Sequence, residues 1–186
     1  MQDKSDFLKE LYFHELDRKK SLEAAFALPT GIVAGLFGMV GYYFTKFNFG
    51  LSGLWQEWLE SAFLFTAVVS VVLLLGAAYW LARAVIGSEY EHLPGAETML
   101  QYWEELEKWH ADNSPRHKTN LAREDFDGFL VNALAGCCQK NWKSNLYRSG
   151  ELYRAKRSVV WALFAIAILS ILYYMNFWLA PDTLRP

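Results

Sequence analysis

The chain has 186 residues, of which 53% are hydrophobic, 20% are charged and 17% are aromatic, and its formal net charge is −2. This composition excludes a disordered tail and a collagen, and two cysteines are too few for a disulfide scaffold. The small net charge gives no support for nucleic-acid binding by the molecule as a whole, so we do not expect direct nucleic-acid binding.

The first segment, residues 1–23, has an apolar stripe at helical spacing, formed by Leu8, Leu11, Tyr12 and Leu16. Its acidic and basic residues are mixed, which is not typical of a cationic helix lying on a membrane surface. We therefore expect a cytosolic amphipathic helix that packs on other cytosolic helices and runs on into the following apolar segment.

Three stretches contain no charged residue: residues 24–45, 61–82 and 158–180. Each is long enough for a helix to cross about 30 Å of hydrocarbon. The alternative is a soluble protein with three buried helices, but a chain of this length has too few other residues to surround them. The sequence therefore predicts an all-α integral membrane protein with three transmembrane helices and the lipid bilayer as its main partner.

The distribution of lysine and arginine predicts the orientation of these spans. Five basic residues precede the first span and ten lie within residues 88–157, whereas Lys46 alone separates the first two spans and Arg185 alone follows the third. We expect a multi-pass protein of the bacterial inner (plasma) membrane. Its N-terminus would be cytoplasmic, its C-terminus outside, and residues 88–157 in the cytosol.

The first span is rich in glycine. Gly31, Gly35 and Gly38 follow small-xxx-small spacing together with Ala34, and such residues let helix backbones approach closely in lipid. Two interpretations remain open, namely packing against the other spans of the same chain and oligomerisation with further copies. The outer loop that follows has an apolar side with Trp55 and Trp58, and we expect a short helix along the outer interface.

Residues 88–157 form the largest soluble part, and the pattern predicts a helical hairpin. One helix is expected from Pro94 to about Trp109, followed by a polar break rich in turn-forming residues. A second helix is expected from Thr119 or Asn120, and since no proline follows until Pro181 we expect it to continue into the third span. The basic run 140–157 either pairs with the acidic first helix or binds lipid headgroups or a nucleotide signal.

On this second helix, Asn141, Asn145 and Arg148 interrupt the apolar stripe, and their spacing of four and three places them on one helical face. Buried polar groups need hydrogen-bond partners, so these three polar residues have two possible roles. They form either a structural network that fixes helix register or a binding site for a ligand or partner, in which Arg148 would meet a phosphate or carboxylate.

The sequence contains no motif that fixes an activity. The four histidines do not lie beside a serine or cysteine in a nucleophile motif, and no glycine-rich phosphate loop is present. Cys137 and Cys138, with His110 and His117, lack the spacing of a zinc site. No ionisable residue lies within a span, which argues against an ion-coupled transporter. We therefore expect a non-enzymatic protein with no metal and no cofactor.

Two segments carry a resemblance to a known group of proteins. They are FLKELYFHELDRKKSLEAAFALPTGI near the start and NWKSNLYRSGELYRAKRSVVWALF before the third span. Together they resemble small bacterial membrane proteins of antiviral defence systems. These include the SLATT-type two-helix effectors and the transmembrane partners of retron, CRISPR and cyclic-oligonucleotide systems. The resemblance implies an oligomeric effector that changes membrane permeability when triggered, although this chain has three expected spans rather than two.

The sequence thus predicts four segments: a cytosolic helix (1–23), a transmembrane hairpin with a short outer loop (24–87), a cytosolic helical domain (88–157), and a third span with a short outer tail (158–186). Two functions are expected. The first is a homo-oligomeric effector that perturbs or permeabilises the membrane when its cytosolic helices receive a signal. The alternative is a non-enzymatic anchor or sensor subunit that recruits a soluble cytosolic defence protein to the inner face.

Overall fold

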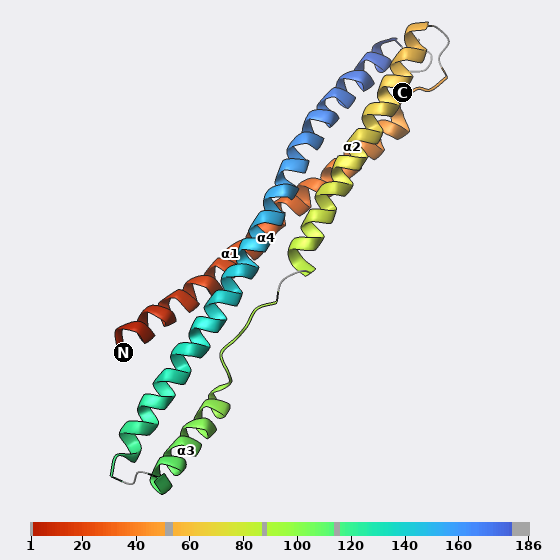
Figure 1. The fold of residues 1–186 in the computed structure, drawn as a ribbon. Coiled ribbons are helices and arrows are strands. Elements are labelled where there is room, and N and C mark those ends of the chain that lie inside the picture. The colour runs from red at the N-terminus through yellow and green to blue at the C-terminus, as the bar shows by residue number, and fades with distance from the viewer. Residues whose placement is uncertain (1, 51–53, 87–88, 114–115, 180–186) are drawn as a thin grey trace. The chain divides into compact units, whose positions relative to one another are not determined.

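The computed structural model describes residues 2–50, 54–86, 89–113 and 116–179. They form four α-helices, α1 (Gln2–Lys46), α2 (Leu54–Ile86), α3 (Ala96–Asn113) and α4 (Lys118–Leu179) (Figure 1). No strand occurs among these described residues. The prediction of an all-α protein is therefore confirmed.

Three of the helices, α1, α2 and α4, are long and apolar enough to cross a membrane. Each contains one of the three uncharged stretches, apart from residue 180, which lies outside the described residues. The prediction of three helices able to span a bilayer, by length and composition, is therefore confirmed. The orientation of the termini and the identity of the membrane stay predictions.

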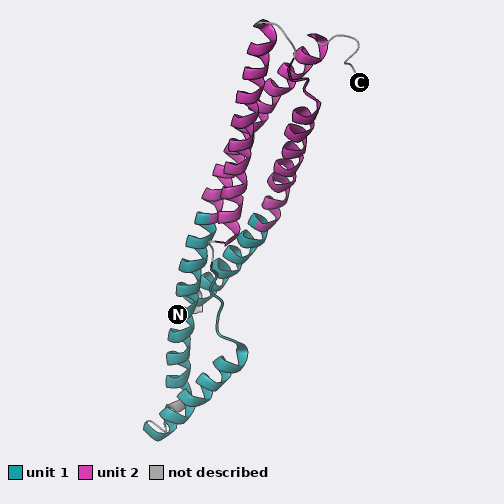
Figure 2. Ribbon diagram, turned by 90° about the vertical axis from the view of Figure 1, so that its right-hand side faces the viewer, with its two compact units in different colours: residues 1–22, 88–147 teal, residues 23–87, 148–186 magenta. Residues whose placement is uncertain are grey.

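The chain divides into two compact units (Figure 2). Unit 1 contains residues 1–22 and 88–147, and unit 2 contains residues 23–87 and 148–186. Both α1 and α4 contribute residues to both units. The uncharged stretches lie in unit 2, and unit 1 contains all of α3.

In unit 1, the start of α1 packs on the first third of α4. The core consists of Tyr12, Leu134, Cys137 and Cys138, with Leu8, Leu11 and Leu16 partly buried against it. The predicted apolar stripe of α1 supplies this contact, and burying such side chains stabilises by roughly 1.5–3 kcal/mol each. Helix α3 contacts the beginning of α4 through aromatic rings, including Tyr102 with Phe129, whose centroids are 4.7 Å apart.

In unit 2, several alanines of α2 and α4 belong to the buried core. Ala77 and Ala84 of α2 and Ala155 and Ala162 of α4 are completely buried. Their spacing of seven residues on each helix returns them to the same face, where small side chains allow close approach. Larger side chains fill the remaining space, and Phe63 of α2 stacks on Phe47 with ring centroids 3.9 Å apart.

Helix α4 continues without interruption from residues of unit 1 into the third uncharged stretch, as its lack of proline predicts. Other boundaries differ from expectation. The expectation of a separate interfacial helix around Trp55 and Trp58 is wrong, because the described part of that segment forms the first turns of α2. Helix α3 begins two residues after Pro94 and extends to Asn113. The predicted outer tail, residues 180–186, lies outside the described residues.

Candidate functional site

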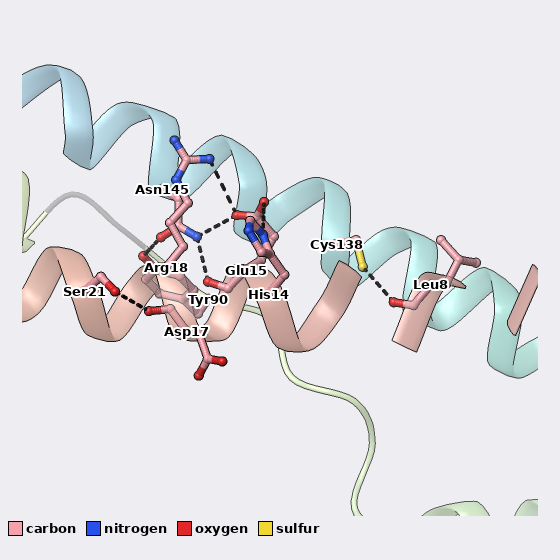
Figure 3. A network of polar contacts seen from close by, with 9 residues as sticks. All are labelled: Leu8, His14, Glu15, Asp17, Arg18, Ser21, Tyr90, Cys138 and Asn145. Atoms are coloured by element: carbon pink, nitrogen blue, oxygen red, sulfur yellow. Dashed lines mark hydrogen bonds and ion pairs between the residues drawn. The ribbon is translucent and has the colours of Figure 1, made fainter. Parts of the chain in front are cut away.

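Asn145 of α4 is completely buried in unit 1 and joins three segments of the chain (Figure 3). Its side-chain amide donates to the main-chain oxygen of Glu15 and to the carboxylate Oε2 of Glu15, both at 2.8 Å. Its oxygen accepts a hydrogen bond from the Tyr90 hydroxyl at 2.5 Å. Arg18 lies 3.9 Å from the same Glu15 carboxylate, so this buried acid has a cationic neighbour as well as an amide donor.

Asn141, one turn earlier on α4, holds the extended segment that precedes α3. It accepts from the main-chain N–H of Glu91 at 2.9 Å and donates to the oxygen of the same residue at 3.0 Å. Ser144 adds a hydrogen bond to the Glu89 oxygen at 2.6 Å. The side-chain amide thus supplies the two bonds that a neighbouring strand would otherwise make, so this segment stays fixed without secondary structure of its own.

Arg148, the third residue of the predicted stripe, belongs to unit 2 and is also buried. Its Nε donates to the Ala84 carbonyl at 3.1 Å, and its Nη1 lies 3.6 Å from the Glu23 carboxylate. Ala84 lies in the last turn of α2, where carbonyls lack partners within the helix and attract cations. Arg148 therefore acts as a C-terminal cap of α2.

All three residues predicted to bind a ligand or partner thus have intrachain contacts. Asn141 and Asn145 belong to one network in unit 1, whereas Arg148 serves a separate cluster in unit 2. These contacts are of the kind expected for a structural network, which is one of the two alternatives that the sequence left open for these residues. A ligand role for the three residues stays a prediction.

A second acidic side chain, Glu151, is buried in unit 2 among arginines. Its Oε1 lies 3.0 Å from Arg154 and 3.9 Å from Arg83, while Oε2 is buried with no hydrogen-bond partner among the described residues. The Trp80 ring lies beside both guanidinium groups, 5.1 Å from that of Arg154 and 5.8 Å from that of Arg83. Such stacking holds the planar groups in place.

The glycines of α1 have open surroundings among the described residues of unit 2. At Gly31, Gly35 and Gly38, no atom of the described chain beyond the local helix lies within 4 Å of the position that a Cβ would occupy. Val33, Leu36 and Val40 of α1 are buried instead. The glycines therefore leave a smooth, exposed strip on α1. Gly35 and Gly38 also border a groove of about 530 Å³ walled by tyrosines of α1 and α4.

The cysteines and histidines do not form a catalytic arrangement among the described residues. Burial, together with the Glu91 carboxylate, raises the pKa of the Cys137 thiol above its ordinary value, and burial also raises the pKa of Cys138. Both thiols are therefore poor nucleophiles at neutral pH. His110 is buried and paired with Asp125 at 2.9 Å. No group of three or more potential metal ligands occurs in the described parts of the chain.

Sequence reasoning missed three buried polar residues, Glu15, Glu151 and Asn176. Glu15 continues the α1 stripe three residues after Tyr12, and Glu151 follows Arg148 by three, so their spacing carried a signal. Asn176 lies in an apolar run, where an amide needs a partner. It finds one in the main chain of Asn48, with hydrogen bonds of 3.0 and 3.1 Å.

No protein-family model, no curated protein and no solved structure matches this chain.

Proposed function

We propose that this chain is an oligomeric effector of a bacterial antiviral defence system that permeabilises the inner membrane after its cytosolic helices receive a signal. The observation that carries the proposal is the exposed glycine strip of α1. Three helices are able to span a bilayer, and at Gly31, Gly35 and Gly38 of α1 no atom of the described chain beyond the local helix lies within 4 Å of the position that a Cβ would occupy. In lipid, glycine strips are typical of helix–helix association. We therefore expect a second copy of this chain to pack against the strip.

The continuous helices connect the segments proposed to receive the signal with the segments proposed to span the membrane. Helix α4 runs from the proposed cytosolic domain into the third span, and α1 runs from the proposed N-terminal cytosolic segment into the first. A change in unit 1 would therefore act on spans that belong to the same helices. The spans contain no ionisable residue within their uncharged stretches, so a pore would have a largely apolar wall that opens by wetting.

The association step is tested by Gly35→Leu. A leucine at this exposed position has space within the monomer but would separate two closely packed backbones. We expect the wild type to be oligomeric in lipid nanodiscs and G35L to be monomeric, measured by mass photometry. Gly76→Leu is the matched control, since Gly76 lies in another span with equally open surroundings. A wild type that is monomeric at every lipid ratio would refute the proposal.

The effector step is tested in cells challenged with bacteriophage. We expect protected cells to lose membrane potential during infection, as read by a potential-sensitive dye, and cells with G35L to keep their potential and lose protection. Protection with the membrane potential intact would refute permeabilisation.

A second candidate function is an anchor or sensor subunit that holds a soluble defence protein at the membrane. It is favoured by large apolar side chains exposed on unit 1, where no lipid is expected. Phe7 and Phe13 are 63% and 62% exposed, and Trp109 is 59% exposed. Exposed aromatic side chains of this kind are typical of protein interfaces. A pull-down from solubilised membranes that returns no stoichiometric partner would contradict this function.

A further inference from the structure

We infer that Arg83, Trp80 and Arg154, here called the arginine clamp, bind the phosphate of an anionic phospholipid. Both arginines approach one oxygen of Glu151, at 3.9 and 3.0 Å, so their guanidinium groups lie close together. One phosphate group has several acceptor oxygens and can bridge two donors at this separation. Trp80 lies beside both guanidinium groups and limits their movement before any ligand arrives.

The charge of this region favours an anion. Two arginines, Arg83 and Arg154, approach the single carboxylate of Glu151. Their side chains are 42% and 57% exposed although they contact Glu151. An anion can therefore reach both side chains, and a guanidinium group carries five N–H donors.

The position of the arginine clamp favours a lipid as the source of this phosphate. Arg83 is the first charged residue after the uncharged stretch 61–82, and Arg154 lies one turn before the stretch 158–180. Both therefore lie where hydrocarbon gives way to headgroups, whichever face of the membrane this is. Tyr79 and Trp161 are each 55% exposed nearby in the sequence, and such rings are typical of the interfacial zone.

Native mass spectrometry of the full chain, released from neutral detergent, tests the inference by counting bound lipids. Short-chain phosphatidylglycerol is the anionic probe, phosphatidylcholine is the zwitterionic probe, and glycerol phosphate is the soluble source of the same chemistry. We expect the wild type to prefer phosphatidylglycerol. R83Q and R154Q should each weaken its binding about five-fold, which is the usual contribution of one basic residue at an anionic membrane surface.

Arg123→Gln is the matched control, because it removes the same charge from an exposed position of α4 in unit 1 and should leave binding unchanged. R154K should fall between wild type and R154Q, since lysine keeps the charge but loses the planar pair of donors. R83Q and R154Q that bind like wild type would overturn the inference. A wild type that binds both lipids equally would also overturn it, without any variant. Glycerol phosphate that competes as well as the lipid would overturn the assignment to lipid.

The inference depends on unit 2 alone and not on the proposed effector function. G35L is expected to bind phosphatidylglycerol like the wild type, whether or not it assembles. Loss of lipid preference in an oligomeric protein would refute the arginine clamp and leave the effector function standing.

Discussion

Asn145 offers the sharpest test of the buried network in unit 1. Replacing it with alanine removes one hydrogen bond to a carboxylate and two to neutral groups. A charged partner contributes about 2 kcal/mol and a neutral one about 1 kcal/mol, giving roughly 4 kcal/mol in total. Arg18 still faces the Glu15 carboxylate at 3.9 Å, which reduces the expected loss to about 3 kcal/mol.

Hydrogen exchange of the α1 amides around Glu15 measures this loss directly, because unit 1 must open before they exchange. A loss of about 3 kcal/mol corresponds to exchange about 100-fold faster. Asn145→Asp keeps the shape but replaces the donor with a second carboxylate beside Glu15, so it should accelerate exchange at least as much. Asn120→Ala, an exposed change on the same helix, is the control. Exchange within three-fold of wild type in N145A would refute the proposed role of the network.

Three further predictions concern other buried groups. Asn176→Leu keeps the volume but removes both hydrogen bonds to Asn48, so unit 2 should lose about 2 kcal/mol in a thermal or denaturant assay, with membrane insertion unchanged. Arg148→Ala removes the cap of α2 and should lower stability by about 2 kcal/mol while the protein still inserts; a melting temperature equal to wild type would contradict the cap. Because the pKa values of Cys137 and Cys138 are raised, iodoacetamide should label both more slowly than in the unfolded chain at pH 8. The contribution of the two thiols to stability is complete below the unfolded-state pKa and is lost as pH rises through the higher folded-state pKa. The double alanine variant should therefore show a flatter stability profile in that range.

The sequence was most informative where one physical requirement dominates. Hydrocarbon excludes charge, so the uncharged stretches predicted the helices that can span a membrane. Proline ends or kinks helices, so its absence after Leu121 predicted the continuity of α4. Helical periodicity placed Asn141, Asn145 and Arg148 on one face, and the structure shows all three buried.

The remaining features depend on which segments meet, which periodicity along one helix does not specify. The spacing of Glu15 places it on the apolar stripe of α1, but the sequence does not show that Asn145 is its partner. The glycines and alanines of the spans look equally suited to close packing, yet the chain uses Ala77 and Ala155 within itself and leaves Gly35 exposed. The start of α2 resembles an interfacial segment, because its tryptophans suit both an interfacial helix and the end of a span.

Asn141 and Asn176 solve the same problem at two places on α4. Each binds the main-chain N–H and C=O of one residue outside the helices, Glu91 in one case and Asn48 in the other, and neither pair of bonds involves that residue's side chain. Related chains should therefore tolerate almost any side chain at positions 48 and 91. A single-residue insertion or deletion just before either position would instead present the N–H and C=O of a different residue. The spacing of these connectors is therefore more restricted than their composition.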